Sequence, residues 1–175
     1  MRNMLKLLVI AFAIIGFVSS IRQVRGQGAP KFEGRTFTHV GLVVRDLDRT
    51  VKMLGDIWGV EAPRISVVPQ VAYPPQATGD RSASVKVAQF QLDNLKIELL
   101  EPTGGPSPYK EWLNKHGEGL NHIAFTVNDI PESIRVLESK GGKWVMGDAT
   151  STFGHVDMPG LGFFIELGRP PAPPK

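Results

Sequence analysis

The sequence predicts an α+β fold in which two tandem βαβββ modules form a curved mixed sheet around a cleft. A ten-residue pattern that begins at Thr38 returns at Asn121, a constant shift of 83 positions. After each copy comes an apolar segment with helical spacing, followed by segments in which apolar and polar residues alternate as in strands. Each copy also carries one histidine near its start and one glutamate near its end. A duplicated unit explains all three observations.

The first repeat begins with a strand and a helix. β-Branched and aromatic residues predominate over residues 36–44, which favours a strand. Asp46 then suits a helix N-cap, and the apolar spacing that follows predicts a helix up to Gly59. We expect a short strand over residues 64–68. Residues 69–81 hold several prolines and no periodicity, so they predict a long loop of the kind that often forms a lid or a substrate wall.

A hairpin closes the first repeat. Residues 83–92 and 95–100 are its predicted strands, and residues 93–94 form a two-residue turn that tolerates positive φ. Residues 102–108 are rich in glycine and proline and are expected to link the repeats. A short helix over residues 109–115 is expected before the second repeat.

The second repeat follows the same order. Asp129 is a suitable N-cap, with a proline in the first turn of the helix that it begins. We expect a strand, a helix and then three strands, over residues 120–127, 131–140, 143–146, 152–157 and 162–167.

The N-terminus predicts a secretory signal peptide over residues 1–26. Two basic residues precede an apolar run over residues 7–18, which is too short to span a bilayer comfortably. Small residues before Gln27 suit a cleavage site, whereas cleavage after Ser20 and an uncleaved anchor are alternatives. We therefore expect a periplasmic or secreted protein that has no membrane contact after cleavage.

The remaining chain divides into a linker, one domain and a tail. The linker covers residues 27–35, and the proline-dense residues 169–175 predict a disordered tail. Between them lies one domain over residues 36–168, with module one at 36–102 and module two at 116–168.

Charge and cysteine content exclude several classes of function. Removal of the signal peptide takes away four basic residues and no acidic one, so sixteen basic and seventeen acidic residues remain. The basic balance of the whole chain therefore does not indicate nucleic-acid binding. The absence of cysteine excludes disulfides, thiol nucleophiles and Cys-ligated zinc. A small molecule is the expected partner.

The repeated histidines and glutamates predict a shared site. Strand alternation places His39 and Glu98 on the sheet face away from the first helix, and His122 and Glu166 lie on the same face of the second repeat. Taken singly, each has a simpler interpretation: Glu98 beside Lys96 suits a solvated sheet face, and a lone histidine is usually structural. Recurrence at equivalent points favours a joint role.

Two neutral imidazoles and two carboxylates are a suitable donor set for one divalent metal ion. Their charge of −2 would cancel that of the ion, and the mixture of nitrogen and oxygen suits Zn, Co, Ni, Mn or Fe(II) better than Ca²⁺ or Cu(I). A six-coordinate ion would keep two positions for water or for a substrate with two adjacent oxygens.

The other two histidines are expected to lie outside this site. His116 follows a predicted helix and is expected to be exposed. His155 shares a strand face with Phe153 and Asp157, and contact with the cleft is the less favoured of its two interpretations.

The repeated unit resembles the vicinal oxygen chelate superfamily, which includes glyoxalase I, methylmalonyl-CoA epimerase, extradiol dioxygenases and bleomycin-resistance proteins. The resemblance covers about residues 37–167. Residues 96–102 (KIELLEP) and 117–125 (GEGLNHIAF) are most similar to methylmalonyl-CoA epimerases. The resemblance implies that the four metal ligands are His39, Glu98, His122 and Glu166.

Two positions differ from the epimerases. Those enzymes use a non-ligand glutamate on the third strand of the first module as one of two acid/base groups. Residues 82–91 hold no acidic residue here, so Gln89 or a neighbour takes its place. Asn121 stands where the epimerases usually have a further histidine.

The resemblance implies an enzyme, an isomerase or lyase that acts on a carbon next to a carbonyl through a metal-stabilised enolate. Glu166 is the expected catalytic base and Glu98 the next candidate. An extradiol-type dioxygenase and a non-catalytic protein that binds a small molecule or confers resistance are the alternatives. Relatives are commonly dimeric, so a homodimer is also expected, although one chain holds both modules.

Overall fold

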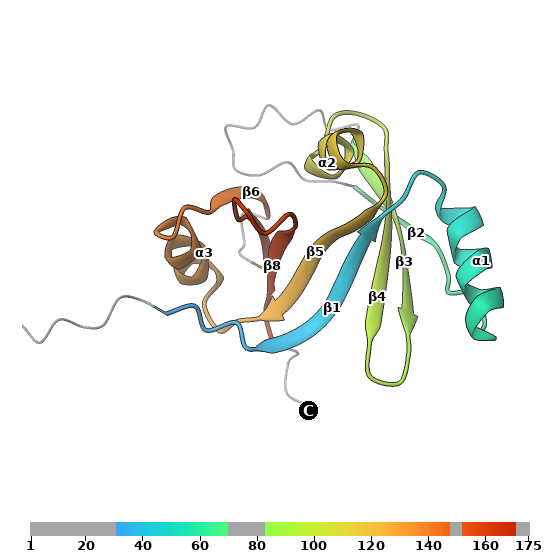
Figure 1. The fold of residues 1–175 in the computed structure, drawn as a ribbon, viewed down its shortest axis with the longest axis horizontal. Helices are drawn as coiled ribbons and strands as arrows, with labels where there is room; N and C mark the ends of the chain where they lie inside the picture. Colours follow the sequence, from blue (N-terminus) through green and yellow to red (C-terminus); the bar gives the residue numbers. More distant parts are fainter. Residues whose placement is uncertain (1–30, 70–82, 148–151, 171–175) are drawn as a thin grey trace, which may run out of the picture.

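A computed structural model describes residues 31–69, 83–147 and 152–170 (Figure 1). The first repeat contains β1 (Thr36–Val43), α1 (Leu47–Trp58), β2 (Ser66–Pro69), β3 (Ser84–Gln91) and β4 (Lys96–Thr103). After α2 (Pro108–His116), the second repeat contains β5 (Gly119–Thr126), α3 (Ile130–Glu138), β6 (Lys143–Gly147), β7 (Phe153–Asp157) and β8 (Phe164–Gly168). Each repeat is therefore a βαβββ unit, as predicted.

The described strands form one curled mixed sheet in the order β2-β3-β4-β1-β5-β8-β7-β6 (Figure 1). The two repeats meet where β1 and β5 pair antiparallel. Outward from this seam, β1 pairs in parallel with β4 and β5 in parallel with β8. The strand order is thus the same in both directions from the centre, and the α+β class with a curved mixed sheet is confirmed.

Helices α1 and α3 pack on one face of the sheet, one on each repeat. Between α1 and the sheet, the fully buried Leu47 of α1 and Leu99 of β4 lie in one apolar cluster. Val40 and Leu42 of β1 pack against this cluster. Under α3, the corresponding cluster includes Ile130, Val156 and Leu167. These are the faces that strand alternation predicted to be apolar. The histidines and glutamates of the repeats are consequently left on the other face.

Helix α2 packs against that other face. Its Trp112 and Leu113 form a cluster with Val43 of β1 and Phe164 of β8, and its Tyr109 packs with Leu100 of β4 in another. Because α2 contacts side chains from both repeats, it closes one side of the space between them.

The predicted helix boundaries rest on capping groups that the structure contains. The Asp46 carboxylate accepts a hydrogen bond from the backbone N–H of Arg49 at 2.9 Å. Asp129 accepts the equivalent bond from Glu132 at 2.9 Å. Helix α1 ends at Trp58 and is followed by the cap residue Gly59, whose φ of 64° lies in the left-handed region that glycine adopts readily.

Several boundaries differ from the expectation. Strand β4 continues to Thr103 instead of ending at residue 100, because its ladder with β3 stays in register until Thr103 pairs with Ser84. Part of the expected 102–108 linker is therefore strand. Helix α3 begins directly after its cap, at Ile130, and ends at Glu138. The expected loop beyond Pro69, the signal peptide and the last five residues lie outside the described part of the chain.

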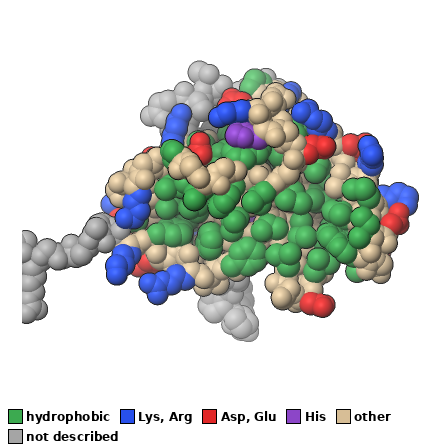
Figure 2. All heavy atoms as spheres, in the orientation of Figure 1, with side chains coloured by type: hydrophobic (Ala, Val, Ile, Leu, Met, Phe, Trp, Pro, Cys, Tyr) green, Lys and Arg blue, Asp and Glu red, His purple; other side chains and the backbone are tan. Residues whose placement is uncertain are grey.

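No helix in residues 31–69, 83–147 or 152–170 is both long and apolar enough to cross a bilayer. Figure 2 shows hydrophobic side chains gathered in the middle of the face in view, with charged side chains mostly around its rim. Within the described residues, Phe37 of β1 and Leu120 of β5 are among the exposed large hydrophobic side chains.

Candidate metal centre

The four expected ligands come from four neighbouring strands at the centre of the sheet. In spatial order, β4, β1, β5 and β8 carry Glu98, His39, His122 and Glu166. Gly41 on β1 is the register partner of both Glu98 and His122. Ala124 holds the equivalent position in the second repeat and is the partner of both His39 and Glu166.

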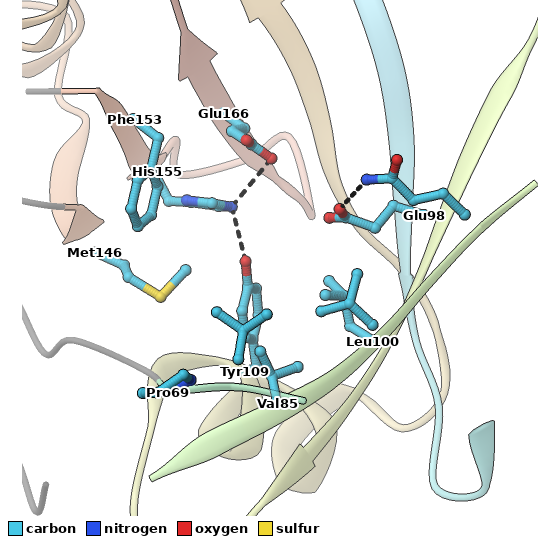
Figure 3. Close-up of a pocket in the computed structure, with 12 residues that line it drawn as sticks. Pro69, Val85, Glu98, Leu100, Tyr109, Met146, Phe153, His155 and Glu166 are labelled. Carbon is cyan, nitrogen blue, oxygen red and sulfur yellow. Dashed lines mark hydrogen bonds and ion pairs between the residues drawn. The ribbon is translucent and has the colours of Figure 1, made fainter. Parts of the chain in front are cut away.

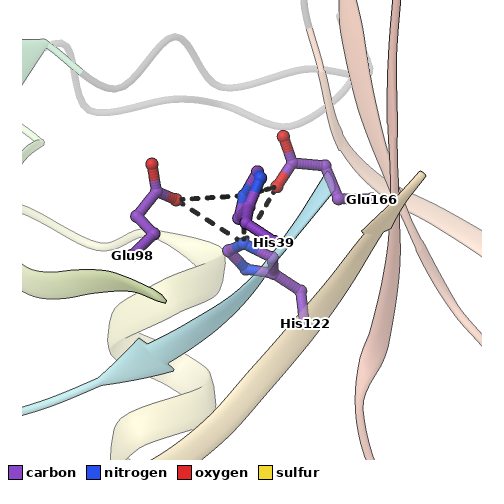
Figure 4. A group of neighbouring side chains, drawn as sticks. All are labelled: His39, Glu98, His122 and Glu166. Atoms are coloured by element: carbon purple, nitrogen blue, oxygen red, sulfur yellow. Dashed lines mark hydrogen bonds and ion pairs between the residues drawn. The ribbon is translucent and has the colours of Figure 1, made fainter. Parts of the chain in front are cut away.

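The small size of Gly41 and Ala124 has a direct consequence for the site. Each lies between two of the longer side chains, so those side chains can lean over it toward the centre of the sheet. The four groups that the sequence suggested are thus brought together (Figure 4).

One nitrogen or oxygen atom from each of the four residues lies within 4.8 Å of all the others. The Glu166 Oε2 atom lies 2.9 Å from the Nε2 atom of His122 and 3.3 Å from that of His39. The Glu98 Oε2 atom lies 3.5 Å from His122 Nε2 and 3.7 Å from His39 Nε2. The two Nε2 atoms are 3.2 Å apart. The donor atoms therefore point at a common centre.

Without a metal, the histidines and carboxylates hold each other in charged forms. Burial alone would lower the pKa of His39, but hydrogen bonds to Glu166 and Glu98 outweigh it and raise the pKa to about 9. Burial alone would raise the pKa of Glu98, whereas hydrogen bonds from His122 and His39 lower it to about 2.

The pKa values of His122 and Glu166 shift for the same reasons. Burial opposes charge on His122, but hydrogen bonds to the two carboxylates raise its pKa. For Glu166, burial is outweighed by interactions with His155 and His122, so its pKa lies well below the usual range.

A β-bulge precedes each of the two clustered histidines. The pairing of β1 with β5 skips Thr38 on one strand and Asn121 on the other, and such an extra residue redirects neighbouring side chains. His39 Nδ1 lies 3.2 Å from the Thr38 hydroxyl. His122 Nδ1 donates to the side-chain Oδ1 atom of Asn121 at 3.0 Å. In both cases Nδ1 is engaged locally and Nε2 faces the centre of the cluster.

Gln89 occupies the position opposite Glu98. The two residues are register partners in the β3–β4 hairpin, and the Gln89 side-chain amide donates to Glu98 Oε1 at 2.7 Å. The sequence interpretation that Gln89 or a neighbour stands in place of an acidic group is consistent with this geometry.

His155 is the residue on which the favoured sequence interpretation was wrong. Its side chain is buried, and its Nε2 lies 3.4 Å from Glu166 Oε2 and 3.2 Å from the Tyr109 hydroxyl (Figure 3). Burial lowers its pKa, which favours the neutral ring. The strand face that it shares with Phe153 was a signal of this position, because both residues line the same cavity. His116 is exposed, as expected.

A cavity of about 530 Å³ opens beside the cluster (Figure 3). Glu98, Glu166, His155, Gln89 and Tyr109 supply its polar wall. The rest of its lining is apolar: Val68, Pro69, Val85, Val87, Leu100, Met146 and Phe153. Both residues that the sequence suggested as proton carriers, Glu166 and Glu98, therefore face a space that a small molecule could enter.

The donor set fits a divalent transition metal. Two imidazole nitrogens and two carboxylate oxygens are ligands that Zn, Co, Ni, Mn and Fe(II) accept. The contacts of Thr38, Asn121 and Gln89 are of the kind that orient ligands in metal sites.

Comparisons with known proteins agree with this fold. A sequence model of the Glyoxalase/Bleomycin resistance protein/Dioxygenase superfamily matches residues 38–158. The ethylmalonyl-CoA/methylmalonyl-CoA epimerase of Cereibacter sphaeroides is 31% identical over 124 residues, which cover 70% of this chain and 83% of that protein. Mouse mitochondrial methylmalonyl-CoA epimerase is 25% identical over 115 residues, which cover 65% of this chain and 58% of the mouse protein. For most of the curated relatives that it matches, the chain spans only between 35% and 58% of their length.

The fold is also found among solved structures. Methylmalonyl-CoA epimerase from Mycobacterium tuberculosis superposes with a TM-score of 0.54 at 22% identity, covering 85% of this chain and 95% of the other. The chain belongs to the Glyoxalase/Bleomycin resistance protein/Dioxygenase superfamily.

Proposed function

We propose that this protein is a metal-dependent enzyme of the isomerase or lyase kind, acting on a carbon next to a carbonyl group. The observation that carries the proposal is the convergence of four donor atoms, one from each central strand, at the wall of a cavity. Relatives named as epimerases and as lactoylglutathione lyases support the reaction class.

Metal binding and proton transfer are both assigned to residues of this chain. His39, Glu98, His122 and Glu166 would hold the ion, and a divalent ion there would supply Lewis acidity toward a carbonyl oxygen. Glu166 is also the proposed base for the proton on the adjacent carbon, a role in which its carboxylate would detach from the ion. It lies at the cavity wall, and its Oε2 lies close to His122 and His155. Glu98 is the second candidate.

Solvent deuterium exchange tests this function. Metal-loaded protein should exchange the proton next to the carbonyl in at least one member of a panel of 2-oxo compounds and acyl thioesters. Glu166→Gln should abolish exchange, whereas Glu138→Gln, at an exposed position on α3, should not. Full exchange by a Glu166→Gln protein that still binds metal would contradict the assignment of the base.

One observation favours a second candidate, a non-catalytic protein that binds a small molecule. Gln89, an amide, faces the cavity where the similar epimerases have a glutamate. Tight binding of a ligand with no exchange and no turnover would select this function.

We also propose that the protein is exported and cleaved before Gln27. The apolar run near the N-terminus supports this proposal. N-terminal sequencing of protein from the native host tests it: a mature chain that begins at Gln27 is expected, and an intact Met1 in the cytoplasm would contradict export. A homodimer stays a prediction.

A further inference from the structure

We propose that the substrate carries an uncharged apolar group, such as a phenyl or branched alkyl group, beside the oxygens that bind the metal. The apolar group would fill the cavity between β3–β4 and β6–β7. This inference rests on the proposed function and names the substrate class of the same site.

The shape of the wall supports an apolar occupant. Val85, Val87 and Leu100 line the cavity from β3 and β4, while Met146 and Phe153 line it from β6 and β7. Val85, Leu100 and Met146 are themselves buried among other apolar side chains, so this wall is firmly packed. The polar groups gather at the end of the cavity where Glu98, Glu166 and His155 lie (Figure 3). A polar group placed against the remaining wall would lose its hydrogen bonds to water without gaining others, so this wall favours an apolar group.

The described lining of the cavity offers no partner for a second anionic group at that wall. None of the twelve described residues that line it is lysine or arginine. Lys86 lies between Val85 and Val87 in sequence but forms ion pairs with Asp48 and Glu101 instead. Because the two carboxylates and a divalent ion cancel, a further carboxylate would lose its hydration without gaining a cation.

Among the described residues, Arg64 defines the rival interpretation. Arg64 lines an adjoining cavity of about 340 Å³, which shares Val68, Val87 and Gln89 with the first. A substrate with a long anionic tail could reach it, so the test includes such a tail.

The test uses three hydroxamates with the same oxygen-chelating head: acetohydroxamate, benzohydroxamate and succinohydroxamate, which ends in a carboxylate. Cobalt-loaded protein is titrated with each, and binding is followed by the visible spectrum of the cobalt. Burial of the phenyl ring should make benzohydroxamate bind about 10- to 100-fold more tightly than acetohydroxamate. Succinohydroxamate should bind no more tightly than acetohydroxamate.

A charge placed in the wall gives the second arm. Val87→Lys should weaken benzohydroxamate and strengthen succinohydroxamate, each by about tenfold or more. Val67→Lys is the matched control, because Val67 is exposed on β2 and does not line the cavity. Thermal melting confirms that both variants are folded.

The outcomes separate this inference from the proposed function. Acetohydroxamate binding with no gain from the phenyl ring would overturn the inference alone. Preference for succinohydroxamate that is lost in Arg64→Ala would also overturn it, in favour of an anionic substrate. A protein that binds no cobalt would overturn the proposed function as well.

Discussion

Gly41 lies against the imidazole ring of His122, and the two residues are register partners across the β1–β5 seam. A methyl group on Gly41 would overlap the ring atoms Cε1 and Nε2 of His122. The ring is completely buried, so it has little room to move away. The absence of a side chain at Gly41 is therefore what allows His122 to reach the centre of the cluster.

Gly41→Ala should consequently displace the His122 ring, one of the four proposed metal ligands. Overpacking of a buried site typically destabilises a protein by about 1–3 kcal/mol, and we expect a fall in the free energy of unfolding of that order together with weaker metal binding. Gly168→Ala is the control, since an added methyl group there meets no atom within 4 Å in the described structure. Chemical denaturation and metal titration measure both effects. Equal metal affinity in the two variants would contradict the role given to Gly41.

Asn121 should act as a positioning residue for His122. The side-chain Oδ1 atom of Asn121 accepts a hydrogen bond from Nδ1–H of His122, which leaves Nε2 of that ring free to bind metal. Asn121→Ala should weaken metal binding by about 10- to 100-fold, the usual effect of losing such a partner. Asn114→Ala, at an exposed position on α2, serves as the control. The NMR shifts of the His122 ring nitrogens should change in the first variant only, and unchanged shifts would contradict the assignment.

Metal affinity should rise with pH up to about 9. In the metal-free protein, burial would lower the pKa of His39, but the bonds to Glu166 and Glu98 raise it to about 9. Metal and proton compete for this ring, and the pKa of His122 is raised as well, so between pH 6.5 and 9 the affinity should increase by at least about tenfold per pH unit. Competition with a chelator at several pH values measures this slope. A plateau beginning near pH 6.5 would contradict it.

The same pKa values set the stability of the metal-free protein. His39 binds its proton more tightly when folded, so its contribution is complete below pH 6.5 and is lost as the pH rises through 9. Glu98, with a pKa of about 2, contributes above pH 4.5 and loses that contribution as the pH falls through 2. Melting temperatures of the metal-free protein should show a maximum between these two limits.

Gln89→Glu should add a proton carrier to the cavity. The new carboxylate would face Glu98, where the similar epimerases have a non-ligand glutamate, and a positioned acid/base group contributes about 10²- to 10⁴-fold in rate. We expect deuterium exchange next to a carbonyl to rise by at least about 100-fold. Gln91→Glu is the control, because Gln91 is exposed and does not line the cavity. Unchanged exchange with metal bound would show that a second carboxylate does not limit the reaction.

Much of the fold could be predicted because duplication and alternation are local signals. The repeat at residues 38 and 121 indicated two similar units. Alternation along each strand then separated Val40 and Leu42, which pack with α1, from His39, which faces the cluster. These assignments require only the two-residue period of a strand.

Other parts of the site depend on contacts between segments far apart in the chain. The bulges at Thr38 and Asn121 arise from the pairing of β1 with β5, so neither strand alone reveals them. The contact of His155 with Tyr109 depends on how α2 packs against the sheet. Sequence reasoning therefore located the four side chains that cluster but not the contacts that orient them.

If four side chains from the two repeats hold one ion, elemental analysis of the protein isolated from its native compartment should find about one divalent transition metal per chain. That metal should be lost in His39→Ala and His122→Ala and retained in the exposed control His116→Ala. A folded native protein without metal, or one whose metal survives both substitutions, would rule out this metal site.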